Sequence, residues 1–217
     1  MEEILGTQAP LGGQRVHPKQ AHAVLGQRHS LWVHDGEQIR SSLLRTLFFL
    51  QEVAQRDGTV LFINRNPLYE PLVREVASMC RQPHVQTKWT AGLLSNWDQT
   101  QRQLDHYASF TNRYGDWLDQ NDKSFPMYLR MQKRFDGLKS LRSLPDACIF
   151  LSLADNQAAF REACQLNIPT IGFLNTDMNP TKVDYPIYGQ TQSLQWMHYV
   201  LESFALCFLK YPPSERG

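Results

Sequence analysis

The amino-acid sequence predicts an α/β fold, a mostly parallel sheet with helices on both faces. Short apolar runs of strand length alternate with longer stretches whose apolar residues recur at three and four positions, as expected of strand–helix–strand units. The run at 59–63 is apolar nearly throughout, which indicates a strand covered on both faces. With 217 residues, 42% of them apolar, the chain can bury one sizeable core. These observations favour a three-layer, doubly wound domain.

The first half of the chain is predicted to run strand, helix, strand, helix. A short strand is expected at 31–33, a helix at 37–56 that ends at Asp57-Gly58, a strand at 59–63 and a helix over 68–79. Such alternation favours parallel strands joined by right-handed crossovers. Each helix carries an apolar stripe expected to face the sheet: Ile39, Leu43, Leu47, Leu50 and Ala54 in the first, and Leu68, Leu72, Val73, Val76 and Met79 in the second.

The pattern changes at about 98–142, where the chain is polar and is interrupted by Gly115 and Pro126. Aromatic and aliphatic residues still recur there at a rough helical spacing. The stretch is too polar for a second core. It therefore predicts a helical-hairpin excursion that projects from the sheet or packs over one side.

Alternation resumes after the excursion. Strands are predicted at 147–151 and 170–174 with a helix at 156–166 between them, then a last short strand at 186–188 and a closing helix at 193–210. Five residues of the closing helix are expected to point inward: Leu194, Met197, Leu201, Phe204 and Phe208. The complete order of elements predicts a flavodoxin-like or Rossmann-like architecture.

The predicted domain organisation is simple. Residues 1–15 contain glycines and a proline with little apolar periodicity, so we expect a flexible N-terminal arm there. Residues 16–217 are expected to form a single α/β domain. We expect no membrane span, because no run of about 18 apolar residues occurs, and the N-terminus has no clear signal peptide. The four cysteines form no C-x-x-C pair and have largely apolar neighbours, which favours reduced, buried side chains over zinc ligands.

Sequence signals for catalysis are weak. Neither type of glycine-rich phosphate loop is present, and no G-x-S-x-G elbow occurs. Asp155 and Asp177 follow predicted strands, where a paired-carboxylate or magnesium site could form. Aspartate is also a standard turn and helix-cap residue, and we favour that interpretation. A small α/β metal- or nucleotide-dependent enzyme that uses these two aspartates is the competing hypothesis.

Residues 87–97, the contact segment, combine two tryptophans with polar residues. A buried segment would not need Lys88 and Asn96, and an ordinary loop seldom carries two indoles, so the segment predicts a shaped contact surface. One interpretation is that Trp89 or Trp97 stacks on RNA bases. The other, slightly favoured from the residues alone, is that both are packing residues at the base of the excursion.

Basic residues lie on both sides of the contact segment. The formal net charge is only +1, but residues 123–142 contain six Lys or Arg against one acid, Asp136. These cations could meet phosphates, or they could form a solvated helix face. The predicted RNA-binding set contains Lys19, Lys88, Trp89, Asn96, Trp97, Arg102, Arg130, Lys133, Arg134, Lys139 and Arg142.

The contact segment resembles the W-x-x-G-x-(L/F)-(T/S)-N-(F/W) signature of the small-subunit ribosomal protein two (S-two) family. His17-Pro18-Lys19 stands where that family has a W-N-P-K segment, although the preceding residues depart from its pattern. The resemblance extends from about Val16 to about Lys210. Four further motifs match in the same order: 142–147, 167–172, 175–180 and 184–189.

The resemblance implies a structural constituent of the small ribosomal subunit that binds rRNA and neighbouring ribosomal proteins at the head–body junction, with no catalysis, cofactor, small-molecule substrate or membrane. Within the family, the form of the contact segment looks closest to mitochondrial members. The excursion looks shorter than the family's coiled-coil protrusion. This shorter excursion and the low basic content both favour a mitochondrial member. We therefore expect a mitochondrial ribosome, with a chloroplast or bacterial ribosome as the alternative.

Overall fold

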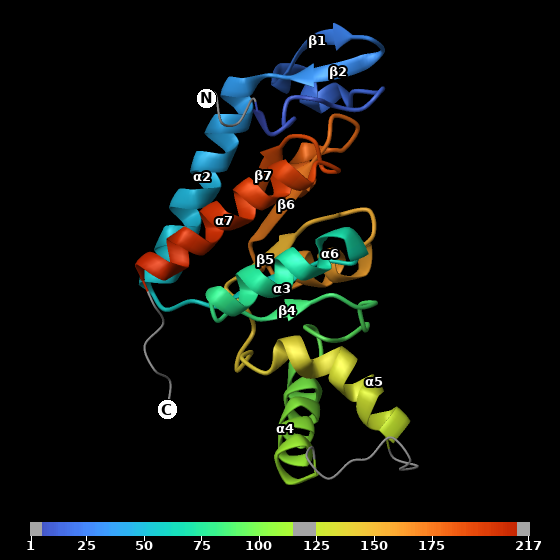
Figure 1. Ribbon diagram of the computed structural model, residues 1–217, viewed down its shortest axis with the longest axis vertical. Coiled ribbons are helices and arrows are strands. Elements are labelled where there is room, and N and C mark those ends of the chain that lie inside the picture. The colour runs from blue at the N-terminus through green and yellow to red at the C-terminus, as the bar shows by residue number, and fades with distance from the viewer. Residues whose placement is uncertain (1–5, 115–124, 212–217) are drawn as a thin grey trace.

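The computed structural model describes residues 6–114 and 125–211 and shows the predicted three-layer α/β fold (Figure 1). Five parallel strands form one sheet in the order β4-β3-β5-β6-β7. The predicted strands at 59–63, 147–151, 170–174 and 186–188 are all present in this sheet. The strand bounds are β3 Val60–Ile63, β4 His84–Val85, β5 Ala147–Phe150, β6 Thr170–Leu174 and β7 Tyr185–Tyr188.

The central strands divide their side chains between two cores. Because successive residues of a strand point to opposite faces, Phe62 and Ile149 belong to one apolar cluster, and Ile63 and Phe150 belong to the other. All residues of β3, β5 and β6 are buried. The nearly continuous apolar runs in the sequence are thus the result of burial on both faces.

Three helices cover the first face: α2 (Gly36–Gln55), α3 (Glu70–Met79) and α7 (Leu194–Lys210). Figure 1 shows α2 and α7 side by side. Side-chain caps begin two of these helices, since Asp35 accepts a hydrogen bond from the amide of Glu37 at 3.0 Å and Ser193 accepts one from the amide of Trp196 at 3.2 Å.

Helix α6 (Gln157–Gln165) and the excursion form the second face. The excursion consists of α4 (Trp97–Tyr114), α5 (Phe125–Phe135) and a short 3-10 helix η3 (Asp136–Leu138), and it projects beyond β4 at one edge of the sheet (Figure 1). Its base is apolar and joins the second core through Leu104, Tyr107, Phe135, Leu138 and Leu141. The excursion is therefore packed onto the domain at its base.

The N-terminal region differs from the prediction. The strand expected at 31–33 exists as β2 (Leu31–His34), but it pairs in a separate antiparallel hairpin with β1 (Val24–Arg28) and does not join the parallel sheet. Residues 6–15, the described part of the expected N-terminal arm, contact the hairpin and the loop after β6. The amide of Gly12 donates to the carbonyl of Trp32 at 2.7 Å, and that of Gly13 donates to Thr176 Oγ1 at 2.9 Å.

Some predicted core positions are exposed, because the local geometry shifts the apolar stripe. Leu68 lies in the 3-10 helix η2 (Pro67–Tyr69), so Tyr69 turns inward in its place and donates its hydroxyl to the carbonyl of Thr191 at 2.8 Å. In α7, Leu194 is exposed, and Trp196 fills the core against Gly189. Cys164 is exposed as well. Among the described residues, no helix has both the length and the apolarity to cross a membrane.

Candidate nucleic-acid interface

The contact segment is held by one buried carboxylate. Glu162 of α6 is 9% exposed, and its side chain accepts four hydrogen bonds from the segment. Oε1 accepts from Trp89 Nε1 at 3.1 Å and from the amide of Gly92 at 2.7 Å. Oε2 accepts from the amides of Leu94 and Ser95 at 3.1 and 3.4 Å.

This arrangement explains the composition of the contact segment. A buried carboxylate is stable only when donors surround it, and the segment supplies an indole N–H and three backbone amides. Gly92 has φ +87°, a left-handed conformation that suits glycine and curves the backbone around the carboxylate. The sequence prediction missed Glu162. The available signal was an ionisable residue between Ala159 and Ala163, on the apolar stripe of a predicted helix.

The two tryptophans are packing residues to different degrees. Trp89 is 9% exposed and its ring belongs to the second core, which agrees with the packing interpretation of this side chain. Trp97 is half-buried, packs against the same core and begins α4. Lys88 and Asn96 are exposed, which is consistent with the predicted contact surface. The segment thus presents polar side chains outward and buries the Trp89 indole.

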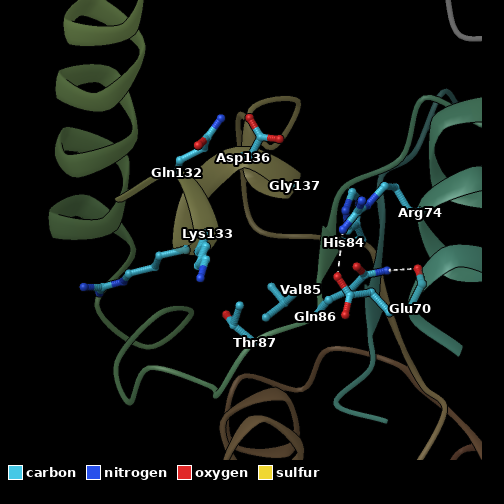
Figure 2. Close-up of a pocket in the computed structure, with 11 residues that line it drawn as sticks. Glu70, Arg74, His84, Val85, Gln86, Thr87, Gln132, Lys133, Asp136 and Gly137 are labelled. Carbon is cyan, nitrogen blue, oxygen red and sulfur yellow. Dashed lines mark hydrogen bonds and ion pairs between the residues drawn. The ribbon is translucent and has the colours of Figure 1, made fainter. Parts of the chain in front are cut away.

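The structure brings Arg102 and Arg134 together across the excursion. Both line a hollow between α4 and α5, and Arg134 Nη2 donates to Gln103 Oε1 at 3.4 Å. The Arg134 guanidinium also lies 4.8 Å from the centre of the Phe135 ring, close enough for a cation–π interaction. Lys133 faces a second hollow, the cleft, between α5 and β4 (Figure 2). Arg134 is also among the residues that line it.

The remaining cations of the excursion lie apart from this pair. Lys139 forms an ion pair with Asp136 and lies 5.6 Å from the centre of the Tyr107 ring. Lys139 and Arg142 line a third hollow against α4. Arg130 is exposed, and its Nε donates to the carbonyl of Pro126 at 3.3 Å.

Lys19 does not belong to the same surface. It lies in the 3-10 helix η1 (Pro18–Ala23), which contacts η4 (Pro180–Lys182) in the loop before β7. Its Nζ donates to Thr181 Oγ1 at 3.2 Å. The strands β7 and β4 are opposite edges of the sheet, so Lys19 is remote from the excursion.

The two aspartates of the competing hypothesis, Asp155 and Asp177, lie in turns after β5 and β6. Asp155 is exposed and accepts a hydrogen bond from Ser152 Oγ at 2.7 Å, as expected of a turn residue. Asp177 is also exposed. Among the described residues, no group of three or more His, Cys, Asp or Glu could hold a metal ion.

The loop after β6 instead holds the N-terminal segment. Thr176 Oγ1 donates to the carbonyl of Arg15 at 2.7 Å and accepts from the amide of Gly13. Gln20 Nε2 donates to the carbonyl of Asn175 at 2.8 Å.

Next to this loop, His34 is fully buried, and burial lowers its pKa to about 4. His34 is therefore neutral at physiological pH.

Fold and site together define a three-layer α/β protein with a helical excursion that carries cations. Residues 5–209 match the family model described as "Ribosomal protein S2", and the chain belongs to this family of ribosomal proteins. The small ribosomal subunit protein uS2 of Thermus thermophilus, in each of two strains, is 27% identical over 209 residues, or 93% of this chain and 82% of the relative. The uS2 protein of Rickettsia akari is 26% identical over 204 residues, or 88% and 67%.

Proposed function

We propose that this ribosomal protein is a structural constituent of the small subunit and binds rRNA and neighbouring proteins at the head–body junction. The observation that supports this proposal best is that most cations of the contact segment and the excursion lack acidic partners. Within the part of the chain that the structure describes, Lys139 alone among Lys88, Arg102, Arg130, Lys133, Arg134, Lys139 and Arg142 has a carboxylate within 4.0 Å. Cations without acidic partners are free to meet phosphates.

The proposed protein neighbours are supported by the helical layer on the first face. Phe48 of α2 and Leu206 of α7 are each 66% exposed, and Leu209 is 48% exposed. The net charge of +1 also fits a surface divided between RNA and protein contacts.

We further propose that the ribosome is mitochondrial. The form of the contact segment, the length of the excursion and the low basic content support this location. The relatives from Thermus and Rickettsia favour a bacterial ribosome as the second candidate.

Sedimentation of the endogenous protein tests both proposals. Mitochondria are lysed and the extract is run on a sucrose gradient at moderate and then at high salt, with a cytosolic extract as the control. Co-migration with the mitochondrial small subunit at moderate salt, with loss at high salt, is the expected result. Migration as a free protein of 25.1 kDa would contradict the ribosomal role, and enrichment outside mitochondria would contradict the location alone.

A further inference from the structure

The cleft beside the excursion has a volume of about 590 Å³. Figure 2 shows its two walls, with Gln132, Lys133 and Asp136 on one side and Glu70 and Arg74 on the other. Its size falls within the roughly 300–1,000 Å³ range of small-ligand sites. It therefore has room for one small polar molecule or one monomer of a polymer.

A close backbone contact sets the spacing of the walls. Gly137 of η3 lies against His84 of β4 so closely that an added Cβ would collide with the His84 carbonyl oxygen. Only glycine allows this approach without a shift of the backbone. The contact joins η3 to β4, so the cleft is a consequence of how the excursion is seated on the sheet.

The charges available in the cleft are positive. Glu70 is paired with Arg74 at 2.7 Å, and Asp136 is paired with Lys139, so both acids already have cationic partners. Among the described residues, Lys133 has no ion-pair or hydrogen-bond partner, whereas the Arg134 guanidinium donates to Gln103 and its Nε is buried. The cleft thus offers the Lys133 ammonium to an anion.

The floor of the cleft supplies neutral hydrogen-bonding groups. Gln86 donates Nε2 to the carbonyl of Glu70 at 2.7 Å, which fixes its amide and leaves Oε1 as an acceptor. Thr87 and Gln132 add further polar groups. Burial lowers the pKa of His84, which favours a neutral ring with one donor and one acceptor. A fixed amide and an unpaired ammonium in one cleft match a nucleobase edge and its phosphate.

We propose that the cleft binds one unpaired nucleotide of RNA, its phosphate held by Lys133 and its base edge by Gln86. This inference rests on the proposed RNA binding and specifies its form. A paired nucleotide does not fit the proposal, because its Watson–Crick edge is already occupied. Gln86 Oε1 selects a base that presents a donor, such as an exocyclic amino group.

The test uses the full chain and two fluorescein-labelled RNA duplexes that are identical except for one bulged nucleotide. Binding is followed by fluorescence anisotropy. The bulged duplex should bind about tenfold more tightly than the perfect one. Gln86→Met should reduce that preference about fivefold, the effect of one hydrogen bond, and should leave binding of the perfect duplex unchanged. Lys133→Ala should weaken binding of both duplexes. It should also reduce the slope of the logarithm of the binding constant against the logarithm of salt concentration by about one.

One control and one second test variant keep the result interpretable. Lys210→Ala removes a cation at the far end of α7 and should leave both affinities unchanged. Gln132→Met changes the opposite wall, where the side chain makes no hydrogen bond with other described residues, and it replaces Gln86→Met if that variant melts at a lower temperature.

The outcomes separate the two proposals. If neither duplex binds, the proposed RNA binding is overturned and this inference with it. Equal binding of the two duplexes, or a preference for the bulge that survives both glutamine variants, overturns the inference about the cleft and leaves the RNA-binding proposal in place.

Discussion

Two polar groups hold peripheral segments to the sheet domain, and they do so in different ways. At one edge the carboxylate of Glu162 accepts four hydrogen bonds from the contact segment. At the other, the neutral hydroxyl of Thr176 donates to Arg15 and accepts from Gly13. A buried charge depends on all its donors together, whereas a hydroxyl contributes bonds that can be lost one at a time. The excursion should therefore detach cooperatively and the N-terminal segment gradually.

Replacement of Glu162 should have the largest effect. Glu162→Ala removes the acceptor of four donors, including the buried Trp89 indole, and should lower the free energy of unfolding by about 3–5 kcal/mol. Urea denaturation measures the loss. Glu162→Gln keeps one acceptor oxygen and should cost about half as much. A negligible loss in Glu162→Gln would mean that the charge is not what holds the segment.

The second-largest effect should be a loss of stability in acid that arises from His34. The pKa of His34 is about 4 in the folded chain, below its ordinary value of 6.5, so the unfolded chain binds a proton first as pH falls. The free energy of unfolding should then decrease between pH 6.5 and 4 by up to about 3 kcal/mol from this residue. Thermal unfolding over this range measures it. A His34→Gln variant should show a flatter pH dependence; an unchanged slope would assign the effect to other groups.

A smaller effect is expected where the excursion meets the sheet. Gly137→Ala places a methyl group against the His84 carbonyl and should cost about 1–3 kcal/mol, because backbone must shift. The unfolding midpoint in urea measures this loss. Gly26→Ala is the matched control, since an added Cβ there meets no atom within 4 Å. Similar midpoints for the two variants would show that the contact between η3 and β4 is loose.

The smallest effect should come from removal of the Thr176 hydroxyl. Thr176→Val keeps the shape of the side chain but loses both hydrogen bonds to the N-terminal segment, and should cost about 1–2 kcal/mol. Hydrogen exchange should show faster exchange at the Gly13 amide while the central strands stay protected. Protection lost equally in the central strands would contradict the expected gradual detachment.

The candidate site was only partly accessible from the sequence. Lys133 and Arg134 are adjacent in the chain and their shared surface was predictable from local basic content. Their cleft was not, because its other wall comes from Glu70 and Arg74, about sixty residues away in the chain. Nothing in a local pattern separates Lys19, at the far edge of the sheet, from the other cations.

The sequence by itself determined the central strands and their helices, because burial on both faces leaves an apolar run in β3, β5 and β6 that needs no knowledge of the partner elements. Only the tertiary structure decided that residues 31–34 join a separate hairpin and that Trp89 is buried. The hairpin depends on pairing with the neighbouring strand β1, and the burial of Trp89 depends on a long-range hydrogen bond to Glu162 across 73 positions. Local periodicity predicts which face of a helix or strand is buried. It does not predict which distant residue packs against that face.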